Sequence, residues 1–169
     1  MRLSRFTTKF GSLGHYEKGH VEIVDDDPRH YAFSNIFETA SVSKPYEKVA
    51  VGRNRQYVLE AIRAEGTSAW YACSHDEFAL VMDGEVTVEL AKLGEGQRPD
   101  PEREGSARLD GEPGGPRMGE VVARRGHMTL LPVGAAYRFH ADAPGVILLQ
   151  TVQGPETVFK WDEICQTTP

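Results

Sequence analysis

Residue types that could support chemistry cluster at His75-Asp76-Glu77, immediately before a short apolar run from Phe78 to Met82. An imidazole and two carboxylates next to one another can bind a metal ion or move a proton. The same residues can equally be the solvated end of a strand. The choice between these interpretations depends on the elements that position the three side chains.

Two strands around a tight turn are predicted for the stretch that carries this cluster. Asp83-Gly84 is a strong two-residue hairpin signal, and Val86, Val88 and Leu90 then alternate with polar residues. The cluster His75-Asp76-Glu77 therefore falls at the mouth of the first strand of a predicted hairpin.

Further short strands are indicated on both sides of this hairpin. A strand is favoured for residues 55–63, because a turn at 66–68 follows it. Apolar or alternating runs indicate four more strands: 120–123, 128–131, 137–140 and 146–152. Turns that contain Gly or Pro separate them, among them Pro144-Gly145. Many short strands of this kind predict an all-β protein, and closure of the sheet edges favours an antiparallel jelly-roll barrel.

The 169 residues are expected to form one domain. Residues 1–52 are predicted to be an irregular N-terminal arm with extensions, and residues 53–152 the barrel. Residues 153–169 are predicted to be a short C-terminal helix and tail, with Pro155 in the first turn of the helix. Residues 94–117 are rich in Gly, Pro and charged residues, and they indicate a long mobile insertion with almost nothing to bury.

Composition excludes several classes of partner. The net charge of -6 argues against nucleic-acid binding, which needs a clustered basic surface. No apolar run approaches the roughly 20 residues that span a bilayer, so no membrane partner and no signal peptide are expected. Two cysteines, Cys73 and Cys165, stand in no metal-binding spacing and fit a reducing compartment. A cytoplasmic protein is therefore expected.

Two spaced patterns resemble the conserved motifs of the cupins. Glu77 is followed seven positions later by Gly84 within a strand-turn-strand, which is similar to the first cupin motif. Gly126 and then Pro132-Val133-Gly134 before an aromatic strand resemble the second motif, and the variable segment between the motifs falls at residues 94–117. The resemblance implies a cupin-type antiparallel jelly-roll barrel.

The resemblance also implies where a metal would be held, and most of those positions are changed. A metal-binding cupin is expected to supply two histidines and a glutamate from the first motif and one histidine from the second. Glu77 matches the glutamate. Other residues occupy the three histidine positions: Tyr71 and Cys73, or Trp70 and Ala72 with the alternative spacing, and Tyr137. Because an iron or manganese site needs about three imidazole or carboxylate ligands, no metal is expected on this chain.

The candidate residues of the barrel pocket are Trp70, Tyr71, Cys73, His75, Glu77 and Tyr137. The aromatic members are expected to fill the barrel. Strand alternation directs His75 to the same face as Glu77 but at the mouth of the barrel, and it directs His140 away from Tyr137. An atypical set of metal ligands stays open as the alternative: Cys73, His75, Glu77 and His140.

Longer runs resemble the small (alpha) subunit of two-subunit hydroquinone 1,2-dioxygenases: residues 46–51, 57–68, 74–85, 124–127 and 144–151. In that family the larger subunit is expected to hold Fe(II) and to cleave the ring of hydroquinone with dioxygen. The resemblance implies that this chain is a non-catalytic, metal-less cupin subunit in aromatic degradation. Its partner would be a larger cupin-type catalytic subunit, in a heterodimer or heterotetramer.

Two alternatives remain at this stage. The chain could be a stand-alone metal-dependent cupin enzyme that uses the atypical ligand set. It could also be a metal-free cupin that binds a small aromatic molecule or a sugar as a sensor, with Trp70, Tyr71 and Tyr137 lining an apolar pocket. The metal content of the chain purified alone separates the first alternative from the subunit interpretation.

Overall fold

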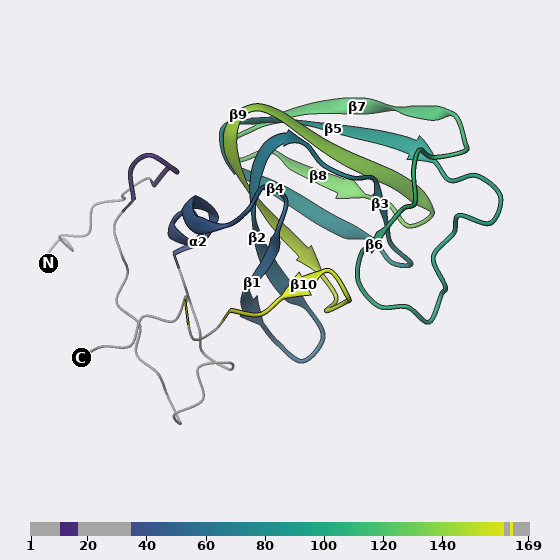
Figure 1. The fold of residues 1–169 in the computed structure, drawn as a ribbon, viewed down its shortest axis with the longest axis horizontal. Coiled ribbons are helices and arrows are strands. Elements are labelled where there is room, and N and C mark those ends of the chain that lie inside the picture. The colour runs from purple at the N-terminus through teal and green to yellow at the C-terminus, as the bar shows by residue number, and fades with distance from the viewer. Residues whose placement is uncertain (1–10, 17–34, 161–162, 164–169) are drawn as a thin grey trace, which may run out of the picture.

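The fold is known from a computed structural model, which describes residues 11–16, 35–160 and 163. Ten strands within these residues join into one curled sheet, and a single short helix packs beside it (Figure 1). The expectation of a mostly β fold is confirmed. The sheet is mixed rather than purely antiparallel, because one of its strand pairs is parallel.

The sheet is organised around one long strand, β9 (Ala135–Thr151). The strands β2 (Val58–Thr67) and β3 (Tyr71–Ala72) pair with one edge of β9. The strands β4 (Glu77–Asp83) and β5 (Glu85–Lys92) pair with its other edge. A strand with partners on both edges is deeply buried, and β9 accordingly contributes Tyr137 and Phe139, the two largest of the fully buried side chains.

The predicted hairpin at Asp83-Gly84 is wrong in its pairing. Both strands exist, but β4 and β5 do not pair with one another: each pairs with a different half of β9. Gly84, with a φ of 76°, turns the chain from one half of β9 to the other. Hydrogen bonding to β9 therefore replaces the local pairing that the turn signal indicated.

The turn predicted at Pro144-Gly145 is also wrong, because β9 runs through both residues. The chain bends there without ending the strand, and three exposed residues, 142–144, mark the bend. The bend lies against the β4–β5 corner, where a Cβ atom on Gly84 would stand 2.9 Å from the Cα atom of Gly145. Two glycines thus let the two corners approach closely.

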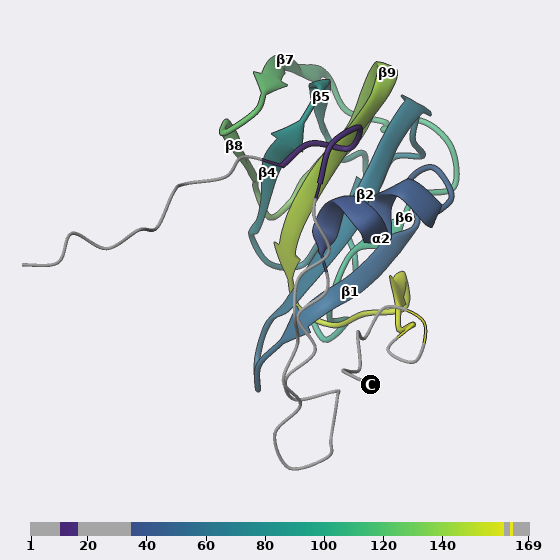
Figure 2. The same ribbon diagram turned by 90° about the vertical axis from the view of Figure 1, so that its left-hand side faces the viewer.

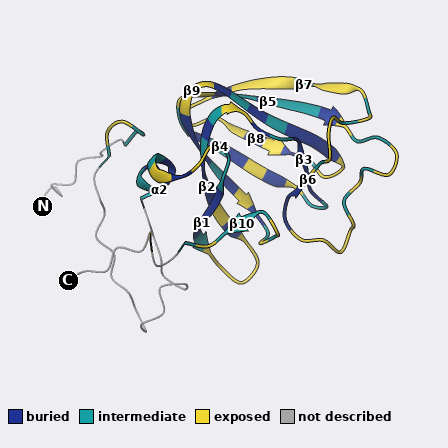
Figure 3. Ribbon diagram, in the orientation of Figure 1, coloured by how far each residue is buried: buried dark blue, intermediate teal, exposed yellow. Residues whose placement is uncertain are grey.

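The remaining strands complete the sheet at its edges. They are β1 (Lys48–Arg53), β6 (Ala107–Arg108), β7 (Arg117–Arg124), β8 (Met128–Leu131) and β10 (Thr157–Val158). The strands predicted at 55–63, 120–123 and 128–131 correspond to β2, β7 and β8. Most of β7 is exposed, whereas β9 is largely buried (Figure 3).

The helix predicted from Pro155 is not seen in the described residues. Residues 155 and 156 form a turn, and Thr157 then enters β10, which runs parallel to β1 with Thr157 opposite Lys48. The Thr157 hydroxyl also donates a 2.6 Å hydrogen bond to the Glu60 carboxyl. These contacts with distant residues override the local helix signal of Pro155 and the acidic residues after it.

A short helix, α2 (Ile36–Val42), lies in a stretch for which no clean period was found. The Asn35 side chain caps it by accepting hydrogen bonds from two backbone amides at its start. Its buried residues Phe37 and Ala40 pack with Val146 of β9, and the helix covers β2 and β9 from outside (Figure 2). Seven residues are too few to show a helical repeat.

The segment 94–117 forms a long excursion between β5 and β7 and is anchored near its middle (Figure 1). Ser106 and Ala107 are buried, and β6 pairs with β3. Gly105 packs so closely on Gly154 that a Cβ atom added to it would lie 2.6 Å from the Gly154 Cα atom. The excursion thereby delivers Ser106 to the concave side of the sheet.

The core lies on that concave side, here called the barrel interior. Its main cluster combines Ile62, Val81, Val88, Phe139 and Leu149 with Tyr71 and Tyr137. No helix in the part of the chain that the structure describes is long and apolar enough to cross a membrane.

Candidate functional site

The barrel interior holds a buried polar cluster, which we call the lysine cluster: Lys48, Tyr71, Glu77, Ser106 and Tyr137. The five side chains come from β1, β3, β4, the 94–117 segment and β9. Lys48 is 3% exposed and Glu77 is 0% exposed. Burial of two ionisable groups demands partners, since an unpaired charge is costly in a core.

Hydrogen bonds link these groups through Ser106. The Lys48 ammonium donates to Ser106 Oγ at 2.7 Å and to the Tyr137 hydroxyl at 3.3 Å. Ser106 Oγ donates to Glu77 Oε1 at 2.7 Å, and the Tyr137 hydroxyl donates to Ser106 Oγ at 3.1 Å. Ser106 Oγ takes part in three of these bonds: it accepts from Lys48 and Tyr137 and donates to Glu77. A serine hydroxyl has one proton and two lone pairs, so its full hydrogen-bonding capacity is used.

The ammonium group of Lys48 also lies close to two aromatic rings, those of Tyr71 and Tyr137. The Lys48 Nζ atom lies 4.0 Å from the centroid of the Tyr71 ring, which is cation–π geometry. The rings of Tyr71 and Tyr137 are 5.8 Å apart, because the two residues are opposite one another in the β3–β9 pair. The cluster is thus filled by side chains.

Burial shifts the proton equilibria in and around this cluster. It lowers the pKa of Lys48, while the charges of Glu77 and Glu60 act in the opposite direction. Burial, reinforced by the charge of Glu77, raises the pKa of Tyr137 well above its usual value. It also raises the pKa of the Cys73 thiol to about 12. The phenol and the thiol are therefore neutral donors at physiological pH.

A second buried carboxyl group, Glu60 on β2, lies near the lysine cluster. Its Oε1 atom accepts the hydrogen bond from Thr157, and its Oε2 atom has no protein partner. Burial raises the pKa of Glu60 to about 7, although the Lys48 charge opposes that shift. Glu77 Oε2 likewise has no protein partner.

Four of the six candidate pocket residues meet in this region. Tyr71, Glu77 and Tyr137 belong to the lysine cluster, and Cys73 is buried beside it with its thiol donating to the Gly105 carbonyl at 3.2 Å. Trp70 is turned elsewhere. Its indole packs with Ala91 and Ala136, and its N–H donates to Glu112 at 2.8 Å.

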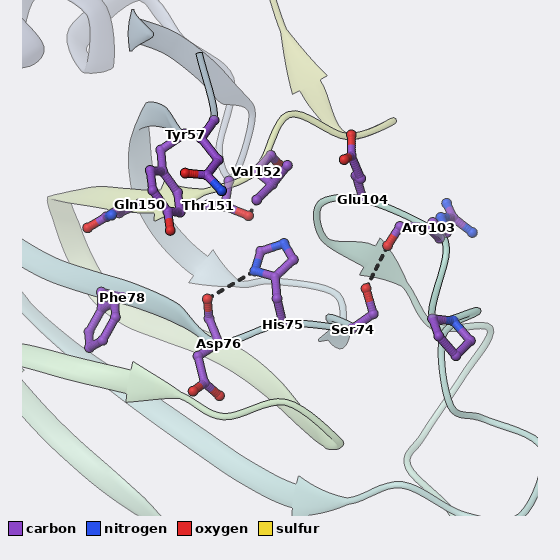
Figure 4. A pocket seen from close by; sticks show the side chains of 12 residues that line it. Tyr57, Ser74, His75, Asp76, Phe78, Arg103, Glu104, Gln150, Thr151 and Val152 are labelled. Atoms are coloured by element: carbon purple, nitrogen blue, oxygen red, sulfur yellow. Dashed lines mark hydrogen bonds between the residues drawn. The ribbon is translucent and has the colours of Figure 1, made fainter. Parts of the chain in front are cut away.

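His75 lies in a different place, a surface cavity of about 500 Å³ (Figure 4). Its Nδ1 atom is 3.0 Å from the Asp76 carbonyl oxygen. A carbonyl oxygen can only accept, so Nδ1 is the donor in this bond. The Asp76 carboxylate accepts from the Val133 amide at 2.8 Å and so ties the start of β4 to the turn before β9. The opening cluster is thus divided between two environments: His75 and Asp76 line the surface cavity, and Glu77 is buried in the barrel interior.

The alternative metal ligands are not brought together. His140 lies away from Tyr137, as strand alternation predicts, and its ring bonds to Thr67 and Asp142. Within the described ranges, no three His, Cys, Asp or Glu side chains are placed to hold a metal ion. A divalent cation among Tyr71, Cys73, Glu77 and Tyr137 would meet the Lys48 ammonium and a protonated thiol. These residues do not fit a metal ion.

Sequence reasoning missed three residues of this region: Lys48, Glu60 and Ser106. Lys48 and Glu60 carried only a weak signal: Lys48 directly precedes the apolar run Val49-Ala50-Val51, and Glu60 lies between Leu59 and Ala61. Ser106 carried none, since it stands in a Gly- and Pro-rich segment that has no periodicity.

Two solved structures contain chains that are closely similar to this one along its whole length. The first is hydroquinone 1,2-dioxygenase from Sphingomonas sp. TTNP3 with 4-hydroxybenzoate bound: 55% identity over 97% of this chain and 99% of that chain, with a TM-score of 0.88. The second is hydroquinone 1,2-dioxygenase PnpCD in complex with Cd2+ and 4-hydroxybenzonitrile: 54% identity over 98% and 100%, with a TM-score of 0.85.

A third similarity is to a longer chain and concerns the fold alone. In the structure of PnpCD in complex with Fe3+, a chain matches at 10% identity with a TM-score of 0.59. The match covers 82% of this chain but only 38% of that one, so that chain is much the longer. Comparison with protein-family models finds no match, and no curated protein matches either.

Proposed function

This chain belongs to the hydroquinone 1,2-dioxygenase family, and we propose that it works as the small, non-catalytic subunit of such an enzyme in aromatic degradation. The observation that carries the proposal is the identity of more than half of the residues along the full length of both chains. Relatives this close share their fold and their place in an assembly. The substrate would be hydroquinone, as in the names of these relatives.

The proposed partner is a larger cupin-type subunit that holds the iron. Two observations support it: a structure of PnpCD in complex with Fe3+ contains a longer chain that shares this fold, and PnpCD also contains a chain of the present size. We propose a heterodimer or a heterotetramer, located in the cytoplasm. Residues 1–169 would act within it as a single cupin domain.

The side chains inside the barrel of this chain argue against a reaction there. Ring cleavage needs iron to activate dioxygen, and the partner would supply it. In this chain the place of a cupin metal is filled by the lysine cluster, whose side chains bond to one another. We therefore propose that the chain contributes a folded surface to the complex rather than a catalytic residue.

The same packing argues against the two alternatives. A stand-alone metal enzyme would need ligands that the structure places in separate environments, with His75 in the surface cavity and His140 bonded to Thr67. A sensor would need an open pocket between Tyr71, Tyr137 and Trp70. The first two rings pack on Lys48, and Trp70 belongs to another cluster.

Reconstitution tests the subunit proposal. The full-length chain purified alone is expected to cleave no hydroquinone and to hold no stoichiometric iron, manganese or zinc. Mixed with the larger subunit, it should restore ring cleavage, measured as the absorbance of the semialdehyde product, and should co-elute with that subunit. Ring cleavage by the chain alone, or full activity of the larger subunit without it, would contradict the proposal.

A further inference from the structure

We propose that the Lys48 ammonium group is the built-in cation of this barrel: it neutralises Glu77 through Ser106 from within the set of positions where a cupin would hold a metal. The inference goes beyond the proposed function. It concerns the charge balance of the chain's own core and does not depend on which partner the chain binds.

The position of the Lys48 Nζ atom is the first observation. It lies 4.0 Å from the centre of the Tyr71 ring and 3.3 Å from the Tyr137 hydroxyl, and one serine hydroxyl separates it from Glu77. Tyr71, Glu77 and Tyr137 are three of the positions at which the motif resemblance places metal ligands. The strands β3, β4 and β9 therefore direct these three side chains into the same part of the barrel interior, and the Lys48 ammonium group lies there.

The matching of donors and acceptors is the second observation. Glu77 accepts from Ser106, and Ser106 accepts from both Lys48 and Tyr137. The Tyr137 hydroxyl, having donated its proton to Ser106, accepts from Lys48. Two of the three ammonium protons are thereby used, and the Tyr71 ring faces the nitrogen as well. The chain of hydrogen bonds thus begins at a donor, the Lys48 ammonium, and ends at an acceptor, the Glu77 carboxylate.

The energetic role of the ammonium follows from burial. Glu77 is 0% exposed, and a buried carboxylate without a positive partner strongly destabilises the folded state. In a metal-binding barrel a metal ion would neutralise the buried glutamate. In this barrel the positive charge of Lys48 would repel a metal cation. The ammonium is part of the polypeptide, so the chain needs no metal to fold.

Glu77 then has a purpose other than metal binding. It is the acceptor at the end of the chain of bonds that crosses the interior from β1 to β4, with Ser106 of the 94–117 segment in the middle. The cluster therefore fastens that segment to the sheet. Loss of either charge is expected to loosen the segment as well as the core.

A double-mutant cycle on the full-length chain tests this proposal. Lys48→Met keeps the length of the side chain and removes the charge, and Glu77→Gln removes the opposite charge. Each single variant is expected to lower the Tm by about 10 °C. The double variant should lose clearly less than the sum of the two, because neither buried charge is left alone. Lys92→Met, at an exposed position of β5, is the matched control and should leave the Tm nearly unchanged.

Additive losses in the cycle would overturn the proposal. If a single variant does not fold, the wild-type chain with nitrogen-15-labelled lysine provides the answer: one slowly exchanging side-chain ammonium signal is expected at neutral pH, and a neutral amine would overturn the proposal. Titration with Co2+ supplies a further readout. No binding to the folded wild-type barrel is expected, whereas a one-to-one complex with a thiolate absorption band from Cys73 would contradict a built-in cation.

Discussion

At the scale of single residues, burial rather than residue type decides what each ionisable group in this chain can do. Cys73 is a thiol whose pKa is about 12, because it is enclosed and lies near the Glu77 charge. It therefore supplies no thiolate for a metal or for nucleophilic attack. Burial lowers the pKa of Lys48, whereas the charges of Glu77 and Glu60 act to raise it. Each group depends on neighbours that are distant in the sequence.

Glu60 makes the stability of the chain dependent on pH. Its pKa rises from 4.5 to about 7 on folding, so the folded state holds a proton that the unfolded chain releases. The stabilising contribution is complete below pH 4.5 and is lost as the pH rises to 7, by up to about 3 kcal/mol. Glu60→Gln should be the more stable protein above pH 7 and should lack this loss.

Measured unfolding free energies of the wild type and Glu60→Gln between pH 4.5 and pH 8 check this prediction. Parallel profiles for the wild type and Glu60→Gln would show that Glu60 does not keep its proton in the folded state.

At the scale of elements, β9 explains why the turn signal at Asp83-Gly84 predicted the wrong pairing. Asp83-Gly84 does form a tight turn, and Gly84 has the positive φ that such a turn requires. The flanking strands nevertheless pair with β9, β4 through residues 78–83 and β5 through residues 87–92, and β9 is long enough, at 17 residues, to pair with both. The turn is therefore a corner at which the chain follows the bend of β9.

The close approach at this corner predicts a specific cost for Gly84→Ala. Gly84 and Gly96 both have a φ of 76°, but only at Gly84 would a Cβ atom meet the backbone, 2.9 Å from the Gly145 Cα atom. Gly96→Ala should cost about 1 kcal/mol, from the left-handed conformation alone. Gly84→Ala should cost about 3 kcal/mol or more, because β9 must also shift.

Urea unfolding of the two variants measures this difference directly. Equal losses at Gly84 and Gly96 would mean that the corner can relax without disturbing β9. A larger loss at Gly84, without a change in the slope of unfolding free energy against urea, is the expected result.

At the scale of the whole molecule, the outer face of the sheet carries an exposed apolar row. Leu59, Phe78 and Leu130 are 38%, 39% and 46% exposed. They lie in register across β2, β9, β4 and β8, with Gln150 between Leu59 and Phe78. Exposed apolar side chains gathered in this way, with Gln150 as the one polar residue between them, are typical of an interaction surface. We expect the larger subunit to cover it.

Phe78→Glu should therefore weaken association with the larger subunit about tenfold or more, because an aromatic contact is replaced by a charge. The Tm of the isolated chain should change little, since the side chain is exposed in it. Val122→Glu, on the exposed strand β7, is the control. Binding curves from titration calorimetry test the expectation, and equal effects of the two variants would place the interface elsewhere.

The sequence by itself determined the class of fold and the family. Alternating strands and Gly and Pro turns predict a β sheet, because the two-residue period of a strand and the φ angles of turns are local properties. The loss of histidines at Tyr71, Cys73 and Tyr137 was also visible in the residues themselves. The strand alternation that directs His140 away from Tyr137 was correct for the same reason.

Only the tertiary structure showed which side chains meet Glu77 in the barrel interior. Lys48 and Ser106 are each 29 positions from Glu77 in the chain, on opposite sides of it. Ser106 also stands in a segment that has no hydrophobic periodicity. Their convergence depends on β9 pairing along both of its edges and on the anchoring of the 94–117 segment against Gly154. Long-range hydrogen bonds and burial set these contacts, and no local pattern in the sequence encodes them.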